Sequence, residues 1–248
     1  MRQNQVLARL RAGEATMGLW MFSGSPLIAE GGAQAGFDWV LLDTQHGHWG
    51  TAELLAATQV VSASRTAPLA RVLRNDPGLI GSLLDMGIMG IIVPLVNSAE
   101  EAALAVAAMR YPPLGQRSFG GQRLSYYGSD YYPAANHEVM AAVMIETGEA
   151  VERAEESLGV PGVDLGFIGP LDLALSLGVP FGSAEHEAAI QHVLQAGRRR
   201  GVPVGIYTGT TQEAKRRAAQ GFQFMPLVTD LPFLQQGLNA AVQEWRKG

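Results

Sequence analysis

Residues 38–72 read DWVLLDTQHGHWGTAELLAATQVVSASRTAPLARV. Two apolar runs, at 38–43 and 68–72, enclose an amphipathic pattern at 51–63. This arrangement predicts a strand, a helix and a second strand. Because both apolar runs are nearly continuous, they favour a parallel sheet that is covered on both of its faces.

The same alternation continues along the whole chain. The candidate strands are residues 17–21, 38–43, 68–72, 90–94, 141–146, 164–169, 203–207 and 222–228. The clearest helical patterns between them lie at 51–63, 77–87, 98–110 and 183–200. Ser183 is suited to cap the last of these helices.

Eight strand–helix repeats in 248 residues predict one α/β domain, a (β/α)8 TIM barrel that spans residues 1–248. A doubly wound open sheet is the alternative. Such a sheet favours a GxGxxG turn after its first strand, and the stretch WMFSGSP at 20–26 does not supply one.

The composition limits the partners and the compartment. The formal charge is −5 and 47% of the residues are hydrophobic, so we expect a large core and no nucleic-acid surface. Cysteine is absent, which excludes disulfides, thiolate metal sites and cysteine nucleophiles. Neither an apolar signal segment nor a run of about 18 apolar residues occurs, so we expect a cytoplasmic protein without a membrane span.

Polar residues follow several of the predicted strands. In a TIM barrel the catalytic groups collect at the carboxyl ends of the strands, so these residues are expected to face one another. Each has a structural explanation when taken alone, such as capping a turn or starting a helix. The residues are Asp43, His46, Arg71, Glu146, Asp172, Tyr207 and Thr208.

The carboxylates of Glu146 and Asp172 favour a metal site. Two buried carboxylates repel each other unless a positive charge lies between them. Oxygen ligands without histidine or cysteine suit a hard ion such as Mg²⁺ or Mn²⁺. Arg71 would add a second, permanent positive charge for a developing oxyanion.

The sequence HGH at 46–48 raises the alternative of a zinc-dependent hydrolase. Such a site needs further histidines at later strand ends. The remaining histidines, which do not end a predicted strand, are His137, His186 and His192. The zinc alternative is therefore not favoured.

The sequence offers no lysine suited to form a Schiff base. Lys215 falls in a helical pattern and Lys247 lies next to the carboxyl terminus, and neither ends an apolar strand. Breaking a carbon–carbon bond beside a 2-oxo acid needs an electron sink, which is either a lysine iminium or a metal ion on the keto oxygen. Without a candidate lysine, such chemistry would take the metal route.

Several motifs together resemble a known enzyme family. They are FDWVLLDTQHG at 37–47, ARVLRND at 70–76, LLDMGIMGIIVP at 83–94, RYPPLGQRS at 110–118, VMIETGEAV at 143–151 and GVDLGFIGPLDLALSLG at 162–178. In this order they resemble the metal-dependent (class II) pyruvate aldolases of the HpcH/HpaI family, which includes the 4-hydroxy-2-oxoheptanedioate and 2-dehydro-3-deoxyglucarate aldolases. The resemblance covers most of the chain.

The resemblance implies a barrel of the phosphoenolpyruvate/pyruvate superfamily. It implies a homo-hexamer, a trimer of dimers, in which the last helix packs on a neighbouring subunit. The metal ligands would be Glu146 and Asp172, holding Mg²⁺ or Mn²⁺, with Co²⁺ as a further option. Arg71 would stabilise the enolate and His46 would be the general base. Asp85 of an adjacent subunit would raise the basicity of that histidine.

The resemblance also places the substrate. The carboxylate of pyruvate would be held by backbone amides of the turn Gly169, Pro170, Leu171 and Asp172. The chain departs from the family at three positions: Met144 replaces a glutamine, Leu171 a small or polar residue, and Gln45 an acid. The departures leave the metal ligands and the base in place and bear on the acceptor aldehyde.

The expected reaction is reversible cleavage of a 4-hydroxy-2-oxo acid, through a metal-stabilised enolate, to an aldehyde and pyruvate or a close 2-oxo acid such as hydroxypyruvate. Oxaloacetate decarboxylation is expected as a side activity, because it passes through the same enolate. A lyase of the same superfamily that acts on a CoA thioester and a non-catalytic binding barrel are the alternatives.

The segment 111–137 is expected to be a long loop rich in tyrosine, glycine and arginine. Loops of this kind at an active face are often functional. Arg117 or Arg123 would then meet an anionic tail of the acceptor, and a plain surface loop is the alternative.

Overall fold

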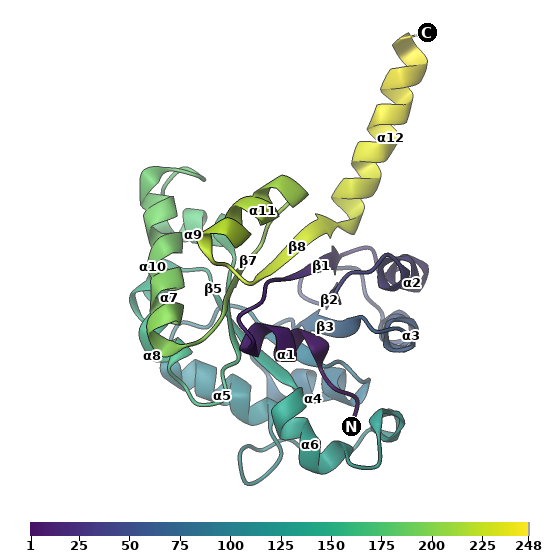
Figure 1. Ribbon diagram of the computed structural model, residues 1–248, viewed down its shortest axis with the longest axis vertical. Coiled ribbons are helices and arrows are strands. Elements are labelled where there is room, and N and C mark those ends of the chain that lie inside the picture. Colours follow the sequence, from purple (N-terminus) through teal and green to yellow (C-terminus); the bar gives the residue numbers. More distant parts are fainter. Residues whose placement is uncertain (248) are drawn as a thin grey trace.

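The eight predicted strands close into a parallel barrel (Figure 1). The computed structural model describes residues 1–247, so Gly248, the last residue of the predicted domain, lies outside the described residues. The strands are β1 (Thr16–Met21), β2 (Trp39–Asp43), β3 (Ala67–Arg71), β4 (Gly90–Val93), β5 (Met140–Ile145), β6 (Leu165–Ile168), β7 (Val204–Ile206) and β8 (Phe224–Thr229). Neighbours pair in chain order, and β1 pairs in parallel with β8. The TIM barrel prediction is confirmed and the open-sheet alternative is wrong.

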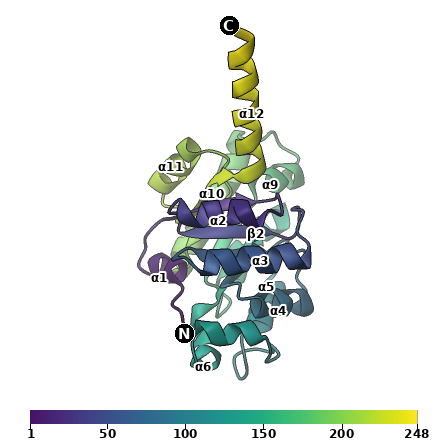
Figure 2. The same cartoon turned by 90° about the vertical axis from the view of Figure 1, so that its right-hand side faces the viewer.

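Helices surround this barrel. They are α1 (Gln5–Arg11), α2 (Pro26–Gln34), α3 (Thr51–Ser62), α4 (Pro77–Asp85), α5 (Ala99–Met109), the 3-10 helix η1 (Gln122–Tyr127), α6 (Tyr131–Glu138), α7 (Gly148–Glu152), α8 (Ala154–Leu158), α9 (Pro170–Leu177), α10 (Ala184–Arg200), α11 (Thr211–Gln220) and α12 (Asp230–Lys247). Figure 2 shows α2 and α3 packed side by side on one flank of the barrel.

Capping residues begin several of these helices. Asp76, Ser98 and Ser183 each accept a hydrogen bond from the backbone N–H three residues later, which satisfies one of the free donors of the first turn. Proline occupies the first turn of α2, α4 and α9, where its missing N–H removes no helical hydrogen bond. The predicted cap at Ser183 is confirmed.

The segment 111–137 contains regular structure that was not predicted. The 3-10 helix and most of α6 lie within it. Helix α6 buries only Tyr131 and Ala135, so it lacks the repeating apolar stripe that marks a helix in sequence. Aromatic rings of the segment pack on one another instead. The prediction of a loop throughout is therefore wrong.

The hydrophobic core has two layers. The larger layer lies between the strands and the surrounding helices. The smaller one fills the barrel with strand side chains, among them Trp20, Trp39, Leu41, Leu69, Met140, Met144, Phe167 and Phe224. Three residues of α1, Val6, Leu7 and Leu10, belong to the same inner cluster. This helix therefore plugs the amino-terminal end of the barrel, which leaves the opposite end for a site.

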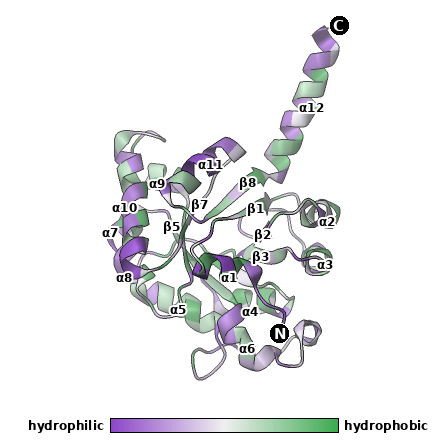
Figure 3. Cartoon of the chain, in the orientation of Figure 1, coloured by the Kyte–Doolittle hydropathy of each residue, from purple (hydrophilic) through white to green (hydrophobic). Residues whose placement is uncertain are grey.

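The last helix, α12, projects away from the barrel (Figures 1 and 3). Among its described residues only Asp230 is buried. Its carboxylate fixes the root of the helix, because it accepts hydrogen bonds from Phe22 N at 2.9 Å and Ser23 N at 3.0 Å, just after β1. An exposed apolar stripe runs along the helix, formed by Leu231, Leu234, Leu238, Val242 and Trp245.

Within residues 1–247, no helix combines the length and the apolar character that crossing a membrane requires.

Candidate active site

Alternation along the strands turns three charged side chains toward the barrel interior. Successive side chains of a strand point to opposite faces. In β3, Leu69 belongs to the inner cluster, so Arg71 two residues later also faces inward. In β2, Leu41 of the inner cluster lies two residues before Asp43, so Asp43 also faces inward. Glu146 directly follows β5 and lies two residues after Met144 of the inner cluster, so it faces inward as well. The three side chains meet at the carboxyl ends of their strands.

Asp43, which is fully buried, organises this end of the barrel. Its carboxylate accepts hydrogen bonds from Trp20 Nε1 at 2.8 Å, from Arg71 Nε at 3.0 Å and from Arg71 Nη2. It also accepts from the backbone N–H groups of Gln45 at 3.0 Å and His46 at 3.2 Å. Asp43 therefore fixes both the loop after β2 and the guanidinium on the next strand.

Arg71 is held so that one nitrogen stays available. Its Nη1 approaches Met144 Sδ at 3.9 Å, and a thioether sulfur is only a weak acceptor. Its Cζ lies 5.1 Å from the centre of the Trp20 ring, which supports the cation from one side. A substrate oxygen beside Met144 would therefore find a charged donor that is already oriented.

A cavity of about 280 Å³ opens over these residues. Its wall is formed by Phe22, His46, Arg71, Met144, Gly169, Pro170, Leu171, Asp172 and Tyr207. Every predicted catalytic or substrate-binding residue except Asp85 is in this wall.

Glu146 lies beside this cavity and is 2% exposed. Its Oε1 accepts a hydrogen bond from Leu95 N at 2.9 Å. Leu95 has a φ of 54°, a left-handed conformation that a leucine rarely adopts. Strain of this kind persists where the surrounding structure requires it, and here it aims an N–H at the carboxylate.

The charges around Glu146 fit a divalent cation. The pKa of Glu146 is raised to about 7, chiefly by burial and also by the adjacent Asp172 carboxylate, while the Leu95 N–H and the Arg71 charge oppose this shift. The carboxyl groups of Asp43, Glu146 and Asp172 thus outnumber the one nearby guanidinium, Arg71, which is already paired with Asp43. A hard ion with two carboxylate ligands would balance that excess and keep its other positions for oxygen atoms of water or substrate.

The start of α9 brings the second carboxylate to Glu146. A Cβ on Gly169 would lie 2.5 Å from Glu146 Oε2 and 2.6 Å from Met144 Cε, so a larger residue here would displace both side chains. Within residues 1–247, Leu171 N and Asp172 N donate to no protein acceptor, as is usual in the first turn of a helix. These two N–H groups can bind an anion at the cavity wall.

His46 is exposed at the cavity wall, whereas His48 is not part of that wall. In the described part of the chain the imidazole of His46 has no hydrogen-bond partner. No group of three or more His, Cys, Asp or Glu side chains in residues 1–247 is placed to hold a metal ion. Because catalytic zinc takes three protein ligands, the zinc-hydrolase alternative finds no ligand set in these residues.

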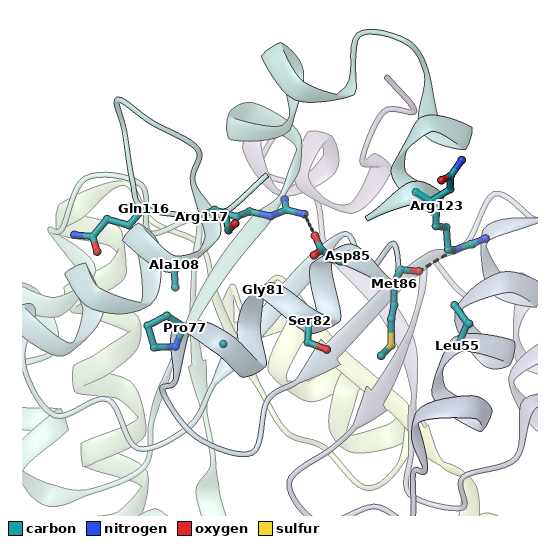
Figure 4. Close-up of a pocket in the computed structure, with 13 residues that line it drawn as sticks. Leu55, Pro77, Gly81, Ser82, Asp85, Met86, Ala108, Gln116, Arg117 and Arg123 are labelled. Carbon is teal, nitrogen blue, oxygen red and sulfur yellow. Dashed lines mark hydrogen bonds and ion pairs between the residues drawn. The ribbon is translucent and has the colours of Figure 1, made fainter. Parts of the chain in front are cut away.

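Asp85 lies away from this cavity within the chain. Helix α4 begins after β3 and returns toward the amino ends of the strands, where Asp85 is its last residue. The carboxylate pairs with Arg117 Nη2 at 3.2 Å beside a separate pocket of about 790 Å³ (Figure 4). Arg117 and Arg123 line this pocket and not the active-site cavity. Neither arginine is therefore placed to bind the acceptor aldehyde in the active site of its own chain.

Two residues of the cavity were not assigned a role from the sequence. Phe22 directly follows β1 and Tyr207 directly follows β7. The Tyr207 hydroxyl shares a hydrogen bond with Thr229 Oγ1 at 2.6 Å, and its ring meets the Trp20 ring edge-on at 5.4 Å. The strand-end rule had already placed Tyr207 with the other residues, and Phe22 was missed because the rule was applied only to polar residues.

The comparison with protein families agrees with the fold. The family described as HpcH/HpaI aldolase/citrate lyase matches residues 16–235. The chain belongs to the HpcH/HpaI aldolase/citrate lyase family. The resemblance predicted from the sequence motifs is thereby confirmed.

Individual relatives of this HpcH/HpaI protein match over nearly their whole length. The chain is 36% identical over 241 residues to the hydroxypyruvate/pyruvate aldolase of Chromohalobacter salexigens, with 94% of each chain covered. It is 39% identical over 238 residues to the 4-hydroxy-2-oxo-heptane-1,7-dioate aldolase of Klebsiella pneumoniae, covering 93% of this chain and 89% of that one. A solved HpcH/HpaI family structure from Burkholderia cenocepacia superposes with a TM-score of 0.93 at 33% identity, covering 98% of this chain and 100% of the other.

These matches establish the class of the HpcH/HpaI chain. It is a carbon–carbon lyase with the TIM barrel of its family, and the names of its relatives support an aldolase activity. A non-catalytic binding barrel is therefore not the function of this chain.

Proposed function

We propose that the protein is a metal-dependent aldolase. It would reversibly cleave a 4-hydroxy-2-oxo acid to an aldehyde and pyruvate, or a close 2-oxo acid such as hydroxypyruvate. The observation that carries the proposal is the geometry of Arg71. Asp43 holds two of its nitrogens, while Nη1 stays available in the cavity wall beside the free N–H groups of Leu171 and Asp172.

The donor set fits a divalent metal ion. Glu146 and Asp172 would hold Mg²⁺, Mn²⁺ or Co²⁺ through carboxylate oxygens. When bound, the ion would supply a Lewis acid that draws electrons from the keto group of the substrate. Neither lysine can take over this task, because Lys215 lies on α11 and Lys247 on α12, outside the cavity wall.

The residues of the cavity would carry out the proton transfer, stabilise the enolate and bind the substrate carboxylate. In the cleavage direction His46, directly or through a water, takes the proton from the C4 hydroxyl. The C3–C4 bond breaks, the aldehyde leaves, and the electron pair moves onto the former keto oxygen as an enolate. Arg71 Nη1 donates to that oxygen, and Leu171 N and Asp172 N hold the carboxylate. Return of a proton to C3 completes pyruvate.

Asp85 would act across a subunit boundary. The imidazole of His46 has no partner in residues 1–247, and Asp85 lies beyond its reach in the same chain. We infer that the protein assembles as a homo-hexamer, a trimer of dimers, in which Asp85 of an adjacent subunit approaches His46. The exposed apolar stripe of α12 supports packing of that helix on a neighbour.

Deuterium exchange tests the proposal. Pyruvate is incubated with the protein in D2O, with Mg²⁺, Mn²⁺ or Co²⁺ and separately with EDTA, and loss of the methyl protons is followed by proton NMR. Metal-dependent exchange is expected, because enolate formation labels the methyl group. No exchange with any of the three ions would overturn the proposal. The variant Glu146→Gln controls for exchange by free metal.

The acceptor would be identified by synthesis. Pyruvate and hydroxypyruvate are each incubated with a panel of aldehydes, and new 4-hydroxy-2-oxo acids are detected by mass. Met144, whose apolar side chain lies between Arg71 and Gly169, leads us to expect that aldehydes with apolar substituents are accepted. Oxaloacetate decarboxylation is expected as a side reaction, and a cytoplasmic location stays a prediction.

A further inference from the structure

We propose that His186 is a positioning residue for the active site, acting through the carbonyl of Pro170. The inference rests on the proposed function, since it assigns His186 to the turn that would bind the substrate carboxylate and carry one metal ligand. From the sequence, His186 is only one of two histidines in a helical pattern.

His186 lies in the first turn of α10 and is 1% exposed. Its Nε2 lies 2.7 Å from Pro170 O, and its Nδ1 accepts a hydrogen bond from Gly182 N at 3.0 Å. The ring of Phe181 covers it, with the ring centres 5.0 Å apart. Both nitrogens of a buried imidazole are thus engaged, one by its own loop and the other by α9.

These contacts define the tautomer. A backbone N–H can only donate, so Nδ1 of His186 must be the unprotonated, accepting nitrogen opposite Gly182. The proton of the neutral ring therefore lies on Nε2, which donates to Pro170 O. The contact with α9 is a directed hydrogen bond and not a packing contact alone.

The hydrogen bond to Pro170 O affects the cavity through one rigid peptide group. The peptide that joins Pro170 to Leu171 is planar, with its C=O and its N–H pointing in opposite directions. Fixing the carbonyl from the His186 side therefore fixes the direction of Leu171 N–H at the cavity wall. It also polarises that N–H, because hydrogen bonds in series strengthen one another. Asp172, the proposed metal ligand, is the next residue.

The turn borders two pockets. Pro170 and Leu171 line the active-site cavity and also a second pocket of about 620 Å³. His186 lines that second pocket and bonds to the turn from there.

Two substitutions separate the two bonds of His186. The amide of glutamine extends about as far as Nε2 and can still donate to Pro170 O, but it no longer accepts from Gly182 N. The amide of asparagine extends about as far as Nδ1 and can still accept from Gly182 N, but it no longer reaches Pro170. Each variant loses one buried hydrogen bond, and the smaller asparagine also leaves more empty space, so the Tm of each variant is measured as well. His192→Asn, an exposed change on the same helix, is the control.

The decisive readouts are the Kd for Mg²⁺ without substrate, by isothermal titration calorimetry, and KM and kcat for pyruvate. His186→Asn is expected to raise both Kd and KM by about tenfold or more, with a smaller change in kcat, as for other residues that orient ligands of a metal. His186→Gln is expected to stay within about twofold of the unchanged protein, since the bond to Pro170 is retained. If His186 had a purely structural role, the Kd for Mg²⁺ and the KM for pyruvate would change in proportion to the loss of Tm in each variant. They would not depend on which of the two hydrogen bonds is lost.

Equal constants for the two variants, or a larger loss in His186→Gln, would overturn the role of His186. The proposed function is tested separately, by the exchange of pyruvate protons in the unchanged protein. If that exchange is observed, the role of His186 can fail while the aldolase proposal still holds. If either variant does not fold, the histidine ring of the unchanged protein labelled with nitrogen-15 is observed by NMR. The Nε2–H resonance of His186 is expected to shift when oxalate is added with Mg²⁺, and an unmoved resonance overturns the proposal.

Discussion

Arg71 combines a fixed position with an unused donor. Asp43 accepts from two of its nitrogens and leaves Nη1 beside the cavity. Arg71→Ala is expected to lower aldol turnover by on the order of a hundredfold or more, because loss of one oxyanion donor costs about 3–4 kcal/mol. Steady-state cleavage kinetics measure this. Arg74→Ala, an exposed change three residues later, is the control, and near-normal turnover in Arg71→Ala would sink the assignment.

Glu146 couples the metal to stability. A carboxyl whose pKa is 4.5 when unfolded and about 7 when folded is costly to ionise in the fold, so it destabilises the metal-free protein above pH 7. Glu146→Gln removes that charge and keeps an acceptor for Leu95 N. With EDTA at pH 8 the variant is expected to unfold at a higher temperature than the unchanged protein, and the difference should shrink toward pH 5.

Added metal should reverse this order. Mg²⁺ or Mn²⁺ is expected to raise the Tm of the unchanged protein, because the ion binds only the folded state, and to leave Glu146→Gln unaffected. Scanning calorimetry at several metal concentrations is the measurement. An equal rise in both proteins would mean that Glu146 is not a ligand.

At the scale of elements, the fit of β1 against β2 depends on a glycine. Gly18 pairs with Trp39 in register, and a Cβ at Gly18 would lie 2.0 Å from the Trp39 ring. That ring cannot move aside, because it stacks on Phe224 with the centres 4.1 Å apart. Gly18→Ala is therefore expected to destabilise the barrel by about 3 kcal/mol, measured by urea unfolding.

Gly31→Ala provides the matched control for this substitution. Gly31 lies within α2, and a Cβ there would meet nothing within 4 Å. Since alanine favours a helix over glycine by about 1 kcal/mol, this variant is expected to be unchanged or more stable. A loss in both variants would point to a general sensitivity of the fold and not to the contact with Trp39.

Sequence periodicity was sufficient for the elements that carry the site. The barrel and the strand-end positions of Arg71, Glu146 and Asp172 followed from runs of apolar residues and the order of the strands. Contacts between distant segments could not be read this way, such as the bond from His186 to Pro170. They depend on how the loops fold back, which has no period in sequence.

The same limit explains the errors and the omissions. In 111–137 aromatic contacts replace an aliphatic stripe, so η1 and α6 gave no periodic signal. Asp43 was expected among the strand-end residues, but its bonds to Arg71 were not predicted, because they depend on the register of β2 with β3. Such register is a property of the closed sheet and not of either strand.

For the whole molecule, α12 is expected to hold the assembly together. Replacing Leu234 and Leu238 by Asp places two charges in the exposed apolar stripe, so the molar mass from light scattering should fall to that of a smaller species. The control replaces Gln236 and Gln243 by Asp on the opposite side of the helix. An unchanged mass in the stripe variant would exclude α12 from the interface.

Shared sites predict complementation between subunits. His46→Ala and Asp85→Ala are each expected to be nearly inactive. When the two are unfolded, mixed equally and refolded, about a quarter of the sites receive an intact His46 and an intact Asp85 from neighbours, and activity should return in that proportion. If the mixture stays as inactive as its parts, Asp85 does not serve a neighbour.

The root of α12 has a mechanical consequence. The carboxylate of Asp230 accepts hydrogen bonds both from the first turn of this long projecting helix and from the backbone of Phe22, which is part of the cavity wall. Because the 18-residue helix and the backbone of Phe22 share this one carboxylate, a change in the tilt of α12 would act like a lever arm on that part of the cavity wall.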